Sequence, residues 1–306
     1  YLTGSITGKD REKNSFDFEK NFIHHLSSPL PYRRPKDQTV EDFCDELVKE
    51  FEQKIEELGA ENIAAFIAEP VLASGGCIVP PDGYFKKMYD VCKKNEIIFI
   101  ADEVVTGFGR LGHFFSSEEI FGVVPDIITC AKGITSGYLP LGAVLFSNKL
   151  IADLKDDSSL FFHGYTYSGH PACCAAALKN IEILKRDKIL EHVKEIEPYF
   201  FEKLNTLYEL PIVGDIRGKG LMAGIECVIN KDSKEALVLD KAIGSRIDEE
   251  SIKLGLIIRP LYHICVLSPA LIINKEQINE LTEKLYQAIS NTIDQLKIEG
   301  LWSQNK

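Results

Sequence analysis

Residues 127–142 are Ile127-Ile-Thr-Cys-Ala-Lys132-Gly-Ile-Thr-Ser-Gly-Tyr-Leu-Pro-Leu-Gly142, a short apolar run that ends in a lysine and a turn rich in glycine and serine. An apolar run of β-branched character predicts a buried strand. A lysine at its end is expected to be partly desolvated, which favours the neutral amine. A neutral amine can attack an aldehyde, so Lys132 is a candidate Schiff-base lysine. A lysine that only leads a strand into a loop is commoner, so a second signal is needed.

A second apolar run, upstream of the first, ends in an acid: Ile97-Ile-Phe-Ile-Ala-Asp102-Glu-Val-Val-Thr-Gly-Phe-Gly109-Arg. We expect Asp102 at the carboxyl end of a neighbouring strand, the edge where ligands bind in open α/β sheets. A buried carboxylate there needs a cation or hydrogen-bond donors, and a protonated pyridine nitrogen is such a cation. An imine-forming lysine and an aspartate that pairs with a pyridinium are the two protein groups that pyridoxal phosphate chemistry requires.

A third motif, Phe161-Phe-His-Gly-Tyr-Thr166-Tyr-Ser-Gly-His-Pro171, places a hydroxyl-rich turn before a proline and a run of small residues. Amides and hydroxyls at the start of a helix favour anions, so this turn is a candidate phosphate site. The alternative is an ordinary turn with a helix that begins at Pro171, because proline is favoured in the first turn and Ser or Thr near the cap.

Together with Ala68-Glu-Pro-Val-Leu-Ala-Ser-Gly-Gly76, these motifs resemble the class III pyridoxal-phosphate aminotransferases in order and spacing, over residues 60–185. The resemblance implies that Lys132 holds pyridoxal 5'-phosphate covalently and that Asp102 pairs with its pyridine nitrogen. It also implies that Val104 packs against the face of the coenzyme ring.

The resemblance further implies that Thr166 binds the phosphate of the coenzyme in a partner subunit. The protein is then expected to be a homodimer with shared active sites, in which a monomer is inactive. The implied fold is α/β, that of the fold-type I transferases: a large domain with a mostly parallel sheet over residues 1–185, incomplete at its amino end, and a smaller C-terminal α/β domain over residues 186–306.

Within the family, the lysine motif is similar to the omega-amino acid:pyruvate transaminases. Ornithine and GABA types carry a gating glutamate where this chain has Ser74, and a substrate arginine where it has Val266. Arg259, in Leu256-Ile-Ile-Arg259-Pro, resembles the mobile carboxylate-binding arginine of the omega type, and guanidinium binds carboxylates through two hydrogen bonds. The alternative for Arg259 is a strand-end arginine that faces solvent, which composition alone favours.

We therefore expect a transaminase that moves an amino group from an omega-amino acid or amine to a keto acid, with pyruvate as the acceptor. One alternative is an enzyme like glutamate-1-semialdehyde aminomutase, although the lysine motif of that enzyme differs. Another is a catalytically incompetent fragment or interaction protein that keeps the fold without coenzyme. Family members extend further at the amino end, where they carry a phosphate loop and a ring-stacking aromatic residue, so a longer polypeptide is expected.

The 306-residue chain has 45% hydrophobic and 26% charged residues, which is ordinary for a globular protein. Its formal net charge of -11 argues against general binding to nucleic acids or anionic membranes. No apolar run reaches the roughly 18 residues of a transmembrane helix. The eight cysteines include no Cys-x-x-Cys pair and the seven histidines show no metal-ligand spacing. We expect reduced cysteines, no metal, small-molecule substrates and a cytoplasmic location.

Helix and strand patterns alternate along the first part of the chain, which indicates a largely parallel sheet. Helices are predicted over residues 43–58, 84–94, 171–185 and 278–296. Strands are predicted over 63–68, from 97, 127 and 143, and as a glycine-punctuated pair over 212–228. Residues 149–159 are predicted to form a polar surface connection.

Overall fold

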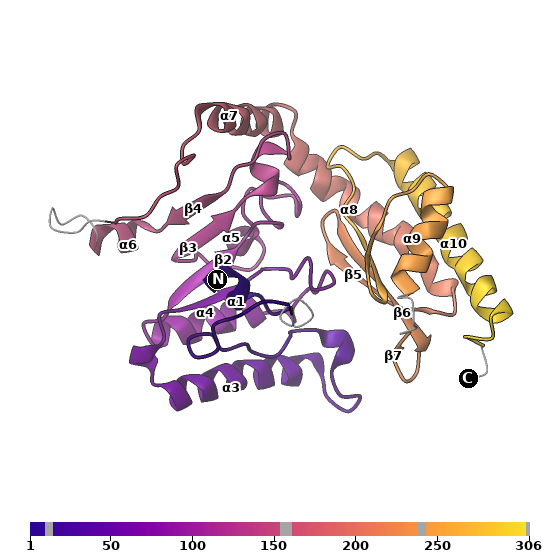
Figure 1. Ribbon diagram of the computed structural model, residues 1–306, viewed down its shortest axis with the longest axis horizontal. Coiled ribbons are helices and arrows are strands. Elements are labelled where there is room, and N and C mark those ends of the chain that lie inside the picture. Colours follow the sequence, from indigo (N-terminus) through magenta and orange to yellow (C-terminus); the bar gives the residue numbers. More distant parts are fainter. Residues whose placement is uncertain (10–14, 154–160, 238–242, 304–306) are drawn as a thin grey trace.

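The structure is a computed structural model that describes residues 1–9, 15–153, 161–237 and 243–303. Its helices and strands are arranged around two separate sheets (Figure 1). The elements up to the end of α7 are α1 (Leu2–Ile6), η1 (Pro31–Arg33), α3 (Val40–Leu58), η2 (Ala60–Asn62), β1 (Ala65–Ala68), α4 (Tyr84–Lys94), β2 (Ile98–Asp102), α5 (Ser116–Glu119), β3 (Ile127–Cys130), η3 (Lys132–Thr135), β4 (Ala143–Phe146), α6 (Asn148–Asp153) and α7 (Pro171–Arg186). The later elements are α8 (Ile189–Asn205), η4 (Thr206–Glu209), β5 (Val213–Lys219), β6 (Met222–Asn230), β7 (Glu235–Ala236), α9 (Ile243–Lys253), β8 (Arg259–Leu261), β9 (Ile264–Leu267) and α10 (Lys275–Ile298).

The first sheet has the strand order β1-β2-β3-β4. As predicted, β1, β2 and β3 are parallel, whereas β4 pairs antiparallel with β3. The reason lies in the connection between β3 and β4. A further parallel strand needs a crossover, usually a helix, that returns the chain to the other end of the sheet. Residues 131–142 contain only the short helix η3, so the chain turns back instead.

Helices α3 and α4 cover one face of the first sheet (Figure 1). The buried residues of α3 recur every three or four positions, as the sequence predicts, and Thr39 caps its start by accepting a hydrogen bond from the Asp42 amide at 3.0 Å. An aromatic cluster packs between helices and sheet: Phe51, Phe66, Phe85, Tyr89 and Phe99. The opposite face, which carries Ile67, Val144 and Phe146, stays accessible to solvent.

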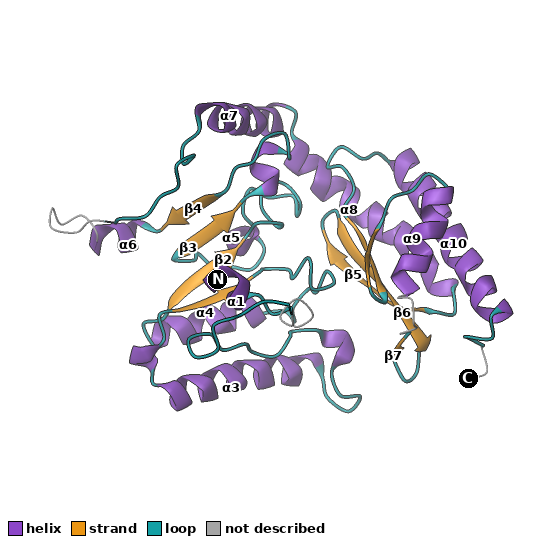
Figure 2. Ribbon diagram, viewed as in Figure 1, coloured by secondary structure: helices purple, strands orange, loops and turns teal. Residues whose placement is uncertain are grey.

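The second sheet is antiparallel, with the order β5-β6-β9-β8 and β7 beside β6. The predicted strand pair is confirmed as β5 and β6. Helices α8, α9 and α10 pack on one face of this sheet (Figure 2). The other face packs against the loop that follows β1, through Met222, Ile264 and Val266. A Cβ atom at Gly224 would lie 2.7 Å from the Gly76 carbonyl oxygen, so glycine is required for this close approach.

Within the described ranges, no helix is both long and apolar enough to cross a membrane. The same residues contain no group of three or more His, Cys, Asp or Glu side chains that could hold a metal ion. The eight cysteines are free thiols. Of the predicted polar connection over 149–159, the first part belongs to α6 and the remainder lies outside the described residues.

A buried group of charges joins the second sheet to the first part of the chain. Arg217 Nη1 lies 2.5 Å from Glu226 Oε2 and 2.8 Å from Asp215 Oδ2, and its Nε donates to the Gly76 carbonyl oxygen at 2.9 Å. Arg33 of η1 also forms an ion pair with Glu226. Because an unpaired buried charge is costly, each partner depends on the others.

The pKa of Glu226 is about 2. Burial acts to raise it, but hydrogen bonds from His263, Arg217 and Arg33 and the charge of Arg217 outweigh burial. A carboxyl group whose pKa is lower in the folded state stabilises the fold above its unfolded pKa. That stabilisation is lost as the pH falls from the ordinary value of 4.5 toward about 2.

We predict that Glu226→Gln lowers the free energy of unfolding at pH 7 and flattens its decline between pH 5 and pH 2, where this carboxylate contributes on the order of 3 kcal/mol. Urea unfolding at a series of pH values measures both effects. The matched control is Glu299→Gln, which removes a more exposed carboxylate paired with Arg246 at 2.8 Å. If the free energy of unfolding depended on pH equally in the Glu226 variant and the wild type, the prediction would be contradicted.

Candidate active site

Three residues that carry reactive groups follow three neighbouring parallel strands. Glu69 comes directly after β1, Asp102 is the last residue of β2, and Lys132 comes soon after β3. The register pairs Ala68 with Ala101 and Asp102 with Thr129, so the carboxyl ends of these strands meet at one edge of the sheet. This is the edge where ligands bind in open α/β sheets.

Asp102 is half-buried and lies on the sheet face that α3 and α4 leave uncovered. Its Oδ1 accepts a hydrogen bond from the Val104 amide at 3.0 Å. Among the described residues, no lysine or arginine forms an ion pair with Asp102. The carboxylate is therefore held in place from one side and keeps its other oxygen available for a cationic partner.

The segment that carries Asp102 and Val104 is anchored by Glu103, which is fully buried. Its Oε2 accepts hydrogen bonds from Thr106 Oγ1 at 2.6 Å and Ser116 Oγ at 2.7 Å. Its Oε1 accepts from the Ser117 amide at 2.6 Å. A buried carboxylate with three donors is well satisfied, so this segment is rigidly attached to the start of α5.

Lys132 begins η3, and its side chain is exposed. The sequence predicted a partly desolvated lysine, whereas the Lys132 side chain is exposed in this structure. The amine makes no hydrogen bond with any described residue. The backbone of the turn is closely packed, since a Cβ atom at Gly133 would lie 2.9 Å from Phe108 Cβ.

Glu69 is a candidate site residue to which the sequence analysis assigned no role. Burial raises the pKa of Glu69, a hydrogen bond from the Ala73 amide at 3.0 Å opposes the rise, and the negative charge of Asp102 adds to it. The positive charge of Lys132 also acts on this carboxyl group. Its sequence signals were its place directly after an apolar run and within the motif over residues 68–76. Strand register brings it beside Asp102.

Arg259 begins β8 and is exposed. Its partner across the β8–β9 ladder is Val266, the position at which the ornithine and GABA types were expected to carry their arginine. Residues directly opposite each other in an antiparallel pair lie side by side on one face. The two alternative arginine positions are therefore neighbours in space, which the sequence alone did not reveal.

The loop after β1 leads from the strand ends to the second sheet, where it packs against Leu261, Ile264 and Val266. Burial raises the pKa of Cys77 to about 12, and the charges of Glu69 and Arg259 both act on this thiol. Ser74 lies in the same loop, which is closed by hydrogen bonds between the backbones of Leu72 and Ile78. Val266, opposite Arg259, packs with Val71 and Ala73 of this loop, so this part of the second sheet lies beside the loop after β1.

Thr166 lies in the segment 161–170, all of whose residues are exposed. The predicted turn before α7 is present, with the Ser168 amide donating to the Tyr165 carbonyl oxygen at 3.0 Å. Among the described residues, no hydrogen bond joins Thr166 to Lys132 or Asp102. The strand register therefore places Lys132, Asp102 and Val104 near one edge of the sheet. Thr166 lies in the exposed segment 161–170, which leads into α7 on the outside of the molecule (Figure 1).

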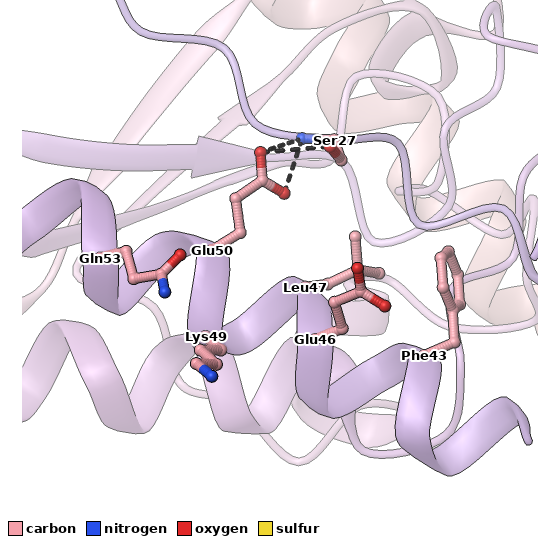
Figure 3. A pocket seen from close by; sticks show the side chains of 7 residues that line it. All are labelled: Ser27, Phe43, Glu46, Leu47, Lys49, Glu50 and Gln53. Carbon is pink, nitrogen blue, oxygen red and sulfur yellow. Dashed lines mark hydrogen bonds between the residues drawn. The ribbon is translucent and has the colours of Figure 1, made fainter. Parts of the chain in front are cut away.

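A surface hollow of about 410 Å³ lies against α3 (Figure 3). It is lined by Ser27, Phe43, Glu46, Leu47, Lys49, Glu50 and Gln53. Glu50 already accepts hydrogen bonds from the Ser27 amide and hydroxyl, both at 3.1 Å. This hollow contains none of the candidate residues and is not the candidate active site.

Comparison with known proteins gives the family. The profile of the family Aminotransferase class-III matches residues 2–289. A putrescine–pyruvate aminotransferase from Pseudomonas aeruginosa is 41% identical over 289 residues, which are 94% of this chain and 63% of that protein. Gamma aminobutyrate transaminase 3, chloroplastic, from Solanum lycopersicum is 38% identical over 309 residues, which cover 100% of this chain and 59% of that protein.

A solved omega-transaminase from Pseudomonas jessenii, in complex with PMP, is 35% identical and has a TM-score of 0.92 to this structure. The match covers 97% of this chain and 66% of that one. The fold is therefore that of the fold-type I transferases that depend on pyridoxal phosphate. The chain belongs to the class-III aminotransferase family. It spans 63% and 59% of the length of the two curated relatives.

Proposed function

We propose that the intact protein is an aminotransferase that moves an amino group from an omega-amino acid or amine to a keto acid, with pyruvate as the acceptor. The observation that carries the proposal is the alignment of Glu69, Asp102 and Lys132 at the carboxyl ends of β1, β2 and β3. We also propose that residues 1–185 form a large coenzyme-binding domain and residues 186–306 a smaller one.

The residues at this edge fit pyridoxal phosphate. The exposed amine of Lys132, which no described residue engages in a hydrogen bond, is free to bond to an aldehyde. The Asp102 carboxylate lies at the same edge and offers an oxygen to a protonated ring nitrogen. The side chain of Val104 provides an apolar contact for the ring. When bound, the coenzyme supplies an electron sink for the carbon that loses a proton.

The proposed roles of the protein groups follow from their chemistry. The Nζ atom of Lys132 would anchor the coenzyme and then, as a free amine, move a proton from the substrate carbon to the coenzyme. The carboxylate of Asp102 keeps the ring nitrogen protonated. Burial raises the pKa of Glu69, which lies beside Asp102 at the same edge of the sheet.

Arg259 is proposed to bind the carboxylate of the keto acid. Its position opposite Val266 supports this role, because it places a guanidinium beside the point where the other types are expected to have one. Ser74 provides no acidic partner that would hold the guanidinium away from a substrate. The relatives described above are named for putrescine with pyruvate and for gamma-aminobutyrate, which supports an amine or omega-amino acid as donor and pyruvate as acceptor.

We further propose a cytoplasmic homodimer in which Thr166 completes the site of the partner subunit. The segment around Thr166 carries four exposed aromatic side chains: Phe161, Phe162, Tyr165 and Tyr167, exposed by 63%, 92%, 77% and 81%. Large exposed aromatic surfaces are typical of protein interfaces. If a second copy packs here, the hydroxyl-rich turn around Thr166 lies at the interface and can reach the partner subunit's site.

Replacing Lys132 by Ala should abolish transamination, lowering kcat by about a thousandfold or more, because the amine is both anchor and proton carrier. Borohydride treatment of the wild type with pyridoxal phosphate, followed by peptide mass spectrometry, should place the reduced adduct on Lys132. The control is Lys179→Ala, which removes an exposed lysine on α7 paired with Glu182. Reduction at another lysine would reject the assignment.

Replacing Arg259 by Ala should raise the KM for pyruvate by about 30-fold or more, because a charge-assisted contact with two hydrogen bonds is lost. The half-reaction with an aromatic amine that lacks a carboxylate should change little. Arg186→Ala, which removes an exposed arginine paired with Asp187, serves as the control. An equal loss for both substrates would make Arg259 a structural residue.

Mixed dimers test the shared site. Chains with Lys132→Ala and chains with Thr166→Ala are each expected to have low activity. A dimer that contains one of each has one site with both residues intact, so random mixing should restore about a quarter of the wild-type activity. Activity that stays at the average of the two parents would show that Thr166 does not serve the partner's site.

A further inference from the structure

The turn that begins with Lys132 has an unusual backbone. Lys132 has a φ of 44° and Ser136 has a φ of 50°, both in the left-handed region that non-glycine residues rarely adopt. Such conformations cost energy and persist only where surrounding contacts fix them. The 3-10 turn between these two residues is too short to supply those contacts itself.

The contacts come from Asn180 on α7, a buried residue 9% exposed. Its Nδ2 donates to the Gly133 carbonyl oxygen at 2.9 Å and to the Ile134 carbonyl oxygen at 3.1 Å. Its Oδ1 accepts from Ser136 Oγ at 2.6 Å. Both hydrogen bonds that the Asn180 amide group can donate thus go to the turn that Lys132 begins.

The turn is held from two sides. On one side Asn180 pairs carbonyl groups that the short turn leaves partly unsatisfied. On the other side Phe108 packs against Gly133, where a Cβ atom would not fit. α7 also packs nearby through apolar residues, including Ala177 and Leu184, so Asn180 is not needed to bury the helix.

We propose that Asn180 is a positioning residue for Lys132. It fixes the left-handed start of the turn, and so holds the amine at the strand edge beside Asp102. The inference rests on the proposed function, in which Lys132 is the covalent anchor. It assigns to α7 a role in the reaction that is separate from packing.

The first test uses backbone hydrogen exchange of the intact protein without added coenzyme. In Asn180→Ala, the amides of residues 134–138 should exchange about 10-fold faster than in the wild type, because the contacts that hold the turn are lost. The matched control is Asn95→Ala, which removes an amide that donates to the Val91 carbonyl oxygen at 2.8 Å at the end of α4. Urea unfolding checks that both variants are folded.

Two further variants separate hydrogen bonding from packing. Asn180→Asp keeps the size of the side chain, but at neutral pH it sets a carboxylate against the Gly133 and Ile134 carbonyl groups. Ser136→Ala removes a single hydrogen bond and leaves both donors of Asn180. If hydrogen bonds donated by residue 180 hold the turn, residues 134–138 should exchange at least as fast in Asn180→Asp as in Asn180→Ala at neutral pH. Ser136→Ala should show the smallest increase in exchange rate.

The second readout is the rate at which added pyridoxal phosphate develops its visible band on the protein, relative to wild type at each pH. As the pH falls, the carboxyl group introduced by Asn180→Asp becomes protonated and can donate a hydrogen bond. That variant should then approach the wild-type rate, while Asn180→Ala does not.

The kcat should fall about 10-fold in Asn180→Ala with little change in the KM for pyruvate, since Arg259 is untouched.

Exchange of residues 134–138 at the wild-type rate in Asn180→Ala would overturn the inference, as would wild-type behaviour of Asn180→Asp at neutral pH. These outcomes are distinct from failure of the proposed function. If the wild type forms no borohydride-reducible bond at Lys132, the proposed function falls. The exchange experiment then still decides whether Asn180 holds the turn.

Discussion

The in-register pairing of three parallel strands is the constraint on which the candidate site depends. Backbone hydrogen bonds of β1, β2 and β3 fix where each strand ends relative to its neighbour, so Glu69, Asp102 and Lys132 lie at one edge. A slip of one residue would turn Asp102 from the open face of the sheet to the face that α3 and α4 cover. The aromatic core between those helices and the sheet opposes such a slip.

The second constraint is the contact between the second sheet and the loop after β1. Gly224 permits the two backbones to approach, and Arg217 joins them by donating to Gly76 while it neutralises Glu226. The same loop is tied to the strand ends through the hydrogen bond between Glu69 and Ala73. Arg259 lies on the edge strand of the second sheet, opposite Val266, which packs against Val71 and Ala73 of this loop.

The segments that support the proposed coenzyme site are held by buried hydrogen bonds, whereas the residues proposed to contact the coenzyme or the partner subunit are exposed. The segment after β2 is anchored by buried Glu103, and the turn after β3 is held by Asn180. By contrast, the amine of Lys132 and the segment around Thr166 are exposed. Rigid support beneath an accessible reactive group is the arrangement that a covalent coenzyme site requires. The exposed aromatic side chains near Thr166 supply surface for the proposed partner subunit.

The sequence by itself determined the local features. Periodicity predicted the helix that ends at Leu58, and the motifs placed Asp102 and Lys132 at strand ends, because these signals lie within short windows. Only the tertiary structure decided the direction of β4, the exposure of Lys132 and the placing of Arg259 opposite Val266. Glu69 escaped prediction because strand register brings it beside Asp102, which is more than thirty residues away in sequence. Asn180 escaped prediction because helix packing brings it to Gly133 and Ser136, which are more than forty residues away.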